Sequence, residues 1–100
     1  MNRTITLIAT DNIGRQESLR LRLPDDVIKK LQKAQDAKYP DGSPCSSLLE
    51  EVTIMIDDYN YGYRGSPSRF HLSRFQYYKL RDFFNLIYHK FYNYTLTMKD

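Results

Sequence analysis

The sequence has 100 residues, of which 41% are hydrophobic, and it carries a formal net charge of +3. This length fits one domain with a modest core, near the size at which dimerisation often adds needed burial. The single cysteine, Cys45, excludes an internal disulfide framework. No stretch approaches the ~20 apolar residues of a membrane span, and the N-terminus lacks the apolar run of a signal peptide. We therefore expect a soluble, cytoplasmic protein that does not associate with membranes.

Two strands are expected at the start of the chain. Residues 3–10 are rich in β-branched side chains, and Asp11-Asn12-Ile13-Gly14 is a turn signal. The next segment alternates leucines with polar side chains: Leu19, Leu21 and Leu23 against Ser18, Arg20 and Arg22. Residues 3–23 are therefore predicted to form a hairpin. Two arrangements remain open, which are a four-stranded sheet shared by two subunits and a hairpin packed on the helices of one chain.

The first helix is expected to follow directly on the leucine strand. Pro24 cannot donate to a strand ladder and suits the first turn of a helix, where Asp25 and Asp26 then favour the helix dipole. One apolar stripe follows at helical spacing: Val27, Ile28, Leu31 and Ala34. The turn residues 39–42 predict that this helix ends near Lys38.

A second helix is expected after this turn, with two possible starts. Either Ser43 caps it and Pro44 begins it, or Ser47 and Glu50 form a capping box. Its apolar face has helical spacing: Leu48, Leu49, Val52, Met55, Ile56 and Tyr59. The glycines and proline of residues 59–68 predict a linker or an ordered loop behind it.

Strand, helix, turn and helix over residues 18–59 resemble the ribbon-helix-helix family of small dimeric DNA-binding proteins. The resemblance implies that a strand pair reads base edges in duplex DNA, through Ser18, Arg20 and Arg22. It also implies that a phosphate binds at the start of the second helix, at Ser43, Cys45 or Ser46. Three further arginines are expected to contact phosphates nonspecifically: Arg64, Arg69 and Arg74.

The C-terminal third has a different charge. Residues 61–100 hold seven Lys and Arg against two Asp and Glu, a net of +5, whereas residues 1–60 hold eight against ten, a net of −2. A helix is expected from the cap Ser73 to about Tyr94, because six apolar residues recur at helical spacing: Leu80, Phe83, Phe84, Ile87, Phe91 and Tyr94. This face is expected to pack on the core or on a second subunit.

The polar side of this helix has two alternative roles. Four tyrosines are interleaved with basic residues and would stack nucleic-acid bases: Tyr77, Tyr78, Tyr88 and Tyr92, with Arg74, Lys79, Arg81 and Lys90. Tyrosine and arginine are also enriched at the hot spots of protein interfaces, so the same residues fit a protein partner.

No catalytic or metal-binding pattern is found. His71 and His89 are 18 residues apart, and the adjacent carboxylate pairs point about 100° apart on a helix, so they do not converge. Near a helix start Cys45 would acquire a lower thiol pKa, but it has no partner base in the sequence. We expect no enzyme, no cofactor and no metal site.

The sequence thus predicts an α+β fold in a single domain. Residues 1–60 form the strands and the ribbon-helix-helix-like core, and residues 61–100 form a basic, aromatic loop and helix packed on it. The expected function is sequence-specific binding of double-stranded DNA by a homodimer, as a small transcriptional repressor of a virus, plasmid or mobile element. The alternative is a protein-interaction module or an inhibitor that binds a nucleic-acid-handling complex, with the C-terminal aromatic helix as the contact for a protein partner.

Overall fold

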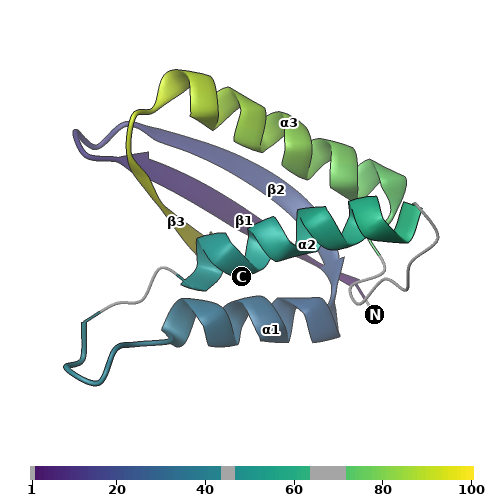
Figure 1. Ribbon diagram of the computed structural model, residues 1–100, viewed down its shortest axis with the longest axis horizontal. Helices are drawn as coiled ribbons and strands as arrows, with labels where there is room; N and C mark the ends of the chain where they lie inside the picture. Colours follow the sequence, from purple (N-terminus) through teal and green to yellow (C-terminus); the bar gives the residue numbers. More distant parts are fainter. Residues whose placement is uncertain (1, 44–46, 64–71) are drawn as a thin grey trace.

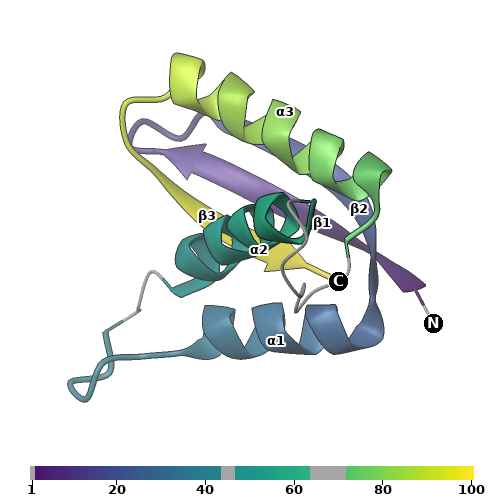
Figure 2. The same ribbon diagram turned by 45° about the vertical axis from the view of Figure 1, so that its right-hand side comes forward.

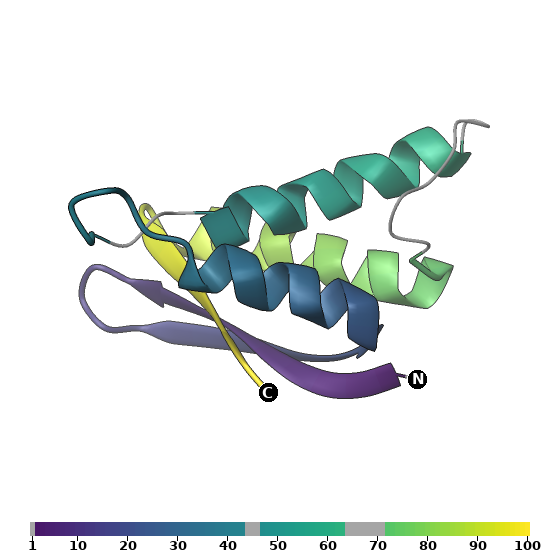
Figure 3. The same cartoon turned by 90° about the horizontal axis from the view of Figure 1, so that it is seen from below.

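A computed structural model describes residues 2–43, 47–63 and 72–100 (Figure 1). Their elements follow in the order β1 (Asn2–Asp11), β2 (Gln16–Pro24), α1 (Asp25–Asp36), α2 (Ser47–Tyr63), α3 (Arg74–Lys90) and β3 (Tyr94–Lys99). The three strands form one antiparallel sheet in the order β2-β1-β3. All three helices lie on the same side of this sheet (Figure 3). The predicted α+β class is confirmed.

The predicted hairpin is confirmed, and it lies within one chain. β1 and β2 pair antiparallel, with Ile5 opposite Leu21 and Leu7 opposite Leu19. Gly14 closes the turn with a φ of 89°, a conformation that glycine adopts without strain. The hairpin packs on the helices, which is the second of the two arrangements that the sequence left open. Pairing with another subunit stays a prediction.

α1 and α2 bury the apolar residues that the periodicity selects. In α1 these are Val27, Ile28 and Leu31, and in α2 they are Leu48, Val52 and Met55. α1 ends at Asp36, two residues before the predicted end. α2 begins at Ser47, and the alternative start at Ser43-Pro44 extends into residues 44–46, which lie outside the described residues.

The predicted linker over residues 59–68 is wrong at its start, because α2 continues to Tyr63. Tyr59 stacks on Tyr77 of α3 with ring centroids 4.1 Å apart, and the Tyr77 hydroxyl donates to the Asn60 side-chain oxygen at 2.9 Å. These contacts with α3 keep the chain helical beyond the predicted break at Tyr59. Residues 64–68 of the predicted linker lie outside the described residues.

The C-terminal third forms a helix and then a strand. The predicted cap is confirmed: the Ser73 hydroxyl accepts from the Gln76 N–H at 3.1 Å, and the Gln76 side chain accepts from the Ser73 N–H at 2.8 Å. The prediction of helix to Tyr94 is wrong, because α3 ends at Lys90 and residues 94–99 form β3. Period-two alternation here buries Leu96 and Met98 against the helices.

The core lies between the sheet and the helices. The odd-numbered residues of β1 and the even-numbered residues of β3 face it, and α3 runs alongside β2 (Figures 1 and 2). α3 contributes four fully or nearly fully buried side chains with the residue that follows it: Leu80, Phe83, Ile87 and Phe91. The helix layer therefore covers one face of the sheet.

Candidate functional site: the open face of the sheet

The open face is the side of the sheet without helices (Figure 3). It consists of the side chains that alternate with the core residues: Thr4, Thr6, Ile8 and Thr10 of β1, Gln16, Ser18, Arg20 and Arg22 of β2, and Thr95, Thr97 and Lys99 of β3. Six of these residues carry hydroxyl groups and three carry positive charges. Ile8 is the one large apolar residue among them.

The three cations of the open face cluster around Thr6. Thr6 lies opposite Arg20 in β2 and opposite Lys99 in β3, so one row across the sheet carries two cations. Arg22 lies two residues further along β2, opposite Thr4. All three side chains are exposed, and among the described residues none of them is in an ion pair.

No carboxylate offsets this charge within the described strands. The two acidic residues of β1 and β2, Asp11 and Glu17, occupy odd-numbered positions and therefore lie on the helical side of the sheet. The open face consequently holds three positive charges and no negative charge. Such a surface attracts polyanions.

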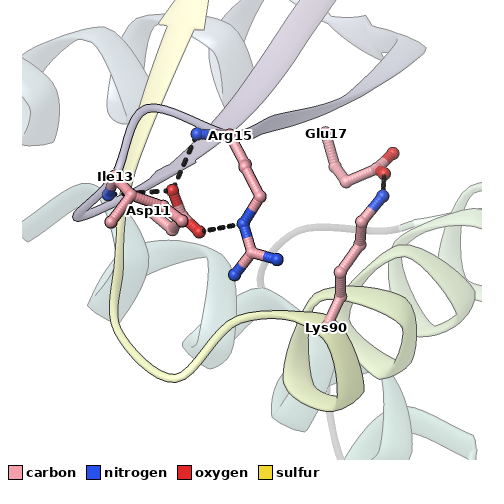
Figure 4. Close-up of polar contacts among 5 residues, drawn as sticks. All are labelled: Asp11, Ile13, Arg15, Glu17 and Lys90. Carbon is pink, nitrogen blue, oxygen red and sulfur yellow. Dashed lines mark hydrogen bonds and ion pairs between the residues drawn. The ribbon is translucent and has the colours of Figure 1, made fainter.

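The β1–β2 turn fixes which residues reach the open face. The Asp11 carboxylate accepts from the Ile13 N–H at 3.1 Å, from the Arg15 N–H at 2.7 Å and from Arg15 Nε at 2.7 Å (Figure 4). Its side chain is 1% exposed. Burial alone would raise the pKa of Asp11, but the Arg15 side chain, the two N–H groups and the Arg15 charge together lower it. A register slip of one residue would turn the arginines toward the core.

Further ion pairs hold both ends of the sheet. Beside the turn, Lys90 of α3 pairs with Glu17 of β2 (Figure 4). At the other end, Arg3 pairs with Asp25 at 2.9 Å and with Asp100 at 2.7 Å. These pairs join the strands to α1, α3 and the C-terminus. Surface pairs of this kind contribute modestly to stability, and they leave the cations of the open face unneutralised.

The predicted site residues do not all meet. Ser18, Arg20 and Arg22 share the open face. Ser43 lies in the α1–α2 loop on the helical side, where its hydroxyl and N–H bond to Asp41 at 2.6 and 2.9 Å, and Arg74 is exposed in the first turn of α3. The remaining predicted phosphate contacts lie outside the described residues: Cys45, Ser46, Arg64 and Arg69.

Lys99 belongs to the open face but is missing from the predicted set. The alternation of residues 95–99, in which threonines and lysine flank Leu96 and Met98, is the signal that identifies it. The basic C-terminal third is therefore divided. Lys99 joins Arg20 and Arg22, whereas the cations of α3 lie on the helical side.

The aromatic residues of α3 have two environments. Tyr77 packs against α2, as described above. Tyr78 is 41% exposed with the Arg81 guanidinium 4.6 Å from its ring centroid, and Tyr88 and Tyr92 are 78% and 94% exposed. These rings lie on or just after a helix on the far side of the sheet from Arg20 and Arg22, so they do not extend the open face.

Among the described residues, no group of three or more potential metal ligands occurs, and no helix is long and apolar enough to span a bilayer. Comparisons with protein-family models, curated proteins and solved structures found no match. They neither support nor contradict the ribbon-helix-helix resemblance.

Proposed function

We propose that this protein binds double-stranded DNA through the open face of its sheet. The observation that carries the proposal is the cluster of Arg20, Arg22 and Lys99, exposed on an uncovered sheet face that has no carboxylate. Clustered cations bind the phosphate backbone, and the hydroxyl groups around them suit contacts to phosphates and to base edges.

The dimensions of the hairpin support binding in the major groove. β3 pairs with β1 only from Thr6 to Asp11, so residues 2–5 and 21–24 form a two-stranded ribbon. The major groove admits a ribbon of this kind. Arg20 and Arg22 are ~6.6 Å apart along the strand, which is close to two base-pair rises of ~3.4 Å. Each guanidinium group can donate two hydrogen bonds to a guanine edge.

The role of this binding is a part of the proposal that rests on the ribbon-helix-helix resemblance. A small transcriptional repressor of a virus, plasmid or mobile element is the role that the family implies. Specific binding by such a protein exceeds its binding to random DNA by ~10³-fold or more. Selection of preferred duplexes from a random pool, followed by measurement of this ratio, tests the role separately from DNA binding itself.

A titration of fluorescently labelled random duplex at several salt concentrations tests the proposal. Arg20→Ala with Arg22→Ala should weaken binding by roughly 30-fold or more, at ~1–3 kcal/mol for each good contact. The matched control is Lys29→Ala with Lys33→Ala, which removes two exposed cations from α1 on the helical side. Equal losses in the two double variants would mean that binding follows net charge alone and that the open face has no special role.

A second candidate function is a protein-interaction module, favoured by the exposed apolar side chains of α3. Phe75 is 68% exposed, Leu86 is 48% exposed and Tyr88 is 78% exposed. Aromatic residues beside arginines are typical of interface hot spots. Because these side chains lie on the helical side, DNA on the open face leaves them uncovered.

A further inference from the structure

The outer edge of β2 is open to another strand. Within the described sheet, β2 has a neighbour on one side only. The Arg22 carbonyl accepts from Gln76 Nε2 at 2.7 Å, so the backbone groups of Arg22 point away from β1. Because this direction alternates along a strand, the backbone N–H and C=O groups of Ser18 and Arg20 face the same outer edge.

The other edge of the sheet is less suitable. β3 has six residues, whereas β2 has nine. The outward N–H of Met98, near the end of β3, donates to the side-chain oxygen of Gln35 in α1. The longer edge, at β2, is therefore the better acceptor for an added strand.

α3 provides side chains above the outer edge of β2. Gln76 near its start bonds to Arg22, and Lys90 at its end pairs with Glu17, so α3 runs antiparallel to β2. Lys79 is one helical turn from Gln76, and Leu86 is one turn from Lys90. Phe75, one turn before Lys79, is 68% exposed and has the Lys79 ammonium 4.8 Å from its ring centroid.

The outer edge thus has three parts that an extended chain requires. The backbone groups of Ser18 and Arg20 offer hydrogen bonds, Phe75 and Leu86 offer apolar contact on the helical side, and Arg20 and Arg22 offer positive charge on the open face. Peptides that add to a sheet edge use main-chain hydrogen bonds for affinity and alternate side chains for specificity.

The charges determine which strand fits. Side chains of a paired strand lie ~4.5–5.5 Å from their neighbours, and like charges directly opposite destabilise the pair. A second copy paired through β2 would place its own arginines beside Arg20 and Arg22. Carboxylates at alternate positions would instead be neutralised there. The edge therefore disfavours a second copy and favours an acidic strand.

We propose that the outer edge of β2 binds an extended segment of a partner protein, with acidic residues on one face and apolar residues on the other. The acidic side chains contact Arg20 and Arg22, and the apolar side chains contact Phe75 and Leu86 of α3. Where the proposed DNA binding holds, this segment and DNA compete for the same two guanidinium groups. That consequence rests on the proposed function, whereas binding of the segment does not.

The probe is a capped octapeptide of alternating glutamate and valine, compared with its lysine–valine counterpart and with a form N-methylated on one edge. NMR titration of the full chain should show new hydrogen-exchange protection at the Ser18 and Arg20 amides. The glutamate peptide should bind at least tenfold more tightly than either comparison peptide. Equal binding of the three peptides, or no change at these two amides, would overturn the proposal.

Ser18→Pro provides the matched protein variant, with Ser18→Ala as its control. Proline removes one outward N–H and leaves the bonds to β1 intact, because an edge strand tolerates proline where its N–H faces outward. The proline variant should lose at least tenfold in affinity for the glutamate peptide, and the alanine variant should not. If Ser18→Pro unfolds, the N-methylated peptide alone decides between main-chain pairing and simple charge attraction.

Two further outcomes have distinct meanings. Concentration-dependent dimerisation that Ser18→Pro abolishes would overturn the proposal, since the occupant would then be a second copy. Peptide binding without DNA binding would support the edge site and remove only the proposed function. DNA binding without peptide binding would overturn the edge site and leave the proposed function standing.

Discussion

The two faces of the sheet share the same three strands but have opposite chemistry. On the helical side, Leu7 is fully buried, and the charged groups at its margins are paired, as Asp11 with Arg15 and Glu17 with Lys90. On the open face, one residue along from Leu7, Thr6 is flanked by Arg20 and Lys99, which have no ion-pair partner among the described residues.

This difference separates stability from function. Burial of apolar surface supplies most of the stability of a domain, and a paired buried charge avoids a large desolvation cost. Three neighbouring cations without a counter-ion add nothing comparable and repel one another. Their position on the uncovered face is therefore best explained by a negatively charged partner, and each prediction below changes one face while leaving the other intact.

The largest effect is expected from removing β3. A chain that ends at Lys90 loses three buried apolar side chains, Phe91, Leu96 and Met98. At ~1.5–3 kcal/mol each, they approach the whole stability of a small domain. We expect loss of cooperative unfolding, measured by thermal melts followed by circular dichroism. A truncated chain with a sharp melting transition would show that the helical face is complete without β3.

This strand also marks where prediction from the sequence stops. The hairpin, α1 and the Ser73 cap follow from local patterns, because alternation, proline chemistry and capping are properties of neighbouring residues. Phe91 and Tyr94 continue the helical spacing of α3, and that local pattern competes with the period of two at residues 95–98. Pairing of β3 with β1, which is distant in sequence, decides between the two periods.

The candidate site was predictable to the same extent. Arg20 and Arg22 were identified because the leucine alternation assigns them to an exposed strand face. Lys99 was not, since its place beside Thr6 depends on the register of β3. The continuation of α2 to Tyr63 was missed for a similar reason. The stack of Tyr59 on Tyr77 joins two helices, and no local pattern encodes it.

The next effect in size concerns adjacent residues of β1 on opposite faces. Leu7→Ala should lower the free energy of unfolding by ~2–5 kcal/mol, because it leaves a cavity in the core. Thr6→Ala, on the open face, should change it by less than ~0.5 kcal/mol. Urea denaturation of both variants measures the difference. Similar losses at the two positions would mean that something covers the open face in solution, such as the second subunit that the sequence resemblance implies.

A smaller effect is expected at the acid end of the pH range. Hydrogen bonds and the Arg15 charge depress the pKa of Asp11 in the folded state despite its burial. Its contribution to stability is therefore complete above the unfolded pKa of ~3.9 and is lost as the pH falls through the lower folded pKa. Asp11→Asn should be less stable at neutral pH and should lose less on acidification below about pH 4.

Urea unfolding measured from pH 7 down to pH 2 gives this comparison. Asp41→Asn is the control, because the pKa of Asp41 is also lowered, first by the Ser43 hydroxyl and then by the Ser43 N–H, but in an exposed loop away from the hairpin. It should alter neutral stability less than Asp11→Asn does. If the Asp11 variant keeps the full stability of the natural chain at pH 7, the turn does not fix the register of the sheet.

The smallest effect separates the two groups of cations in the C-terminal third. If Lys99 contacts a phosphate beside Thr6, Lys99→Ala should weaken DNA binding only a few-fold at moderate salt, but it should reduce the salt slope by ~0.9. Arg81→Ala removes an equally exposed cation from α3, on the other side of the sheet, and should leave the slope unchanged. Binding isotherms for random duplex at four or more salt concentrations resolve such a change. A reduced slope in the Arg81 variant and not in the Lys99 variant would place the nucleic acid on the helices, and the open face would then need another explanation for its three cations.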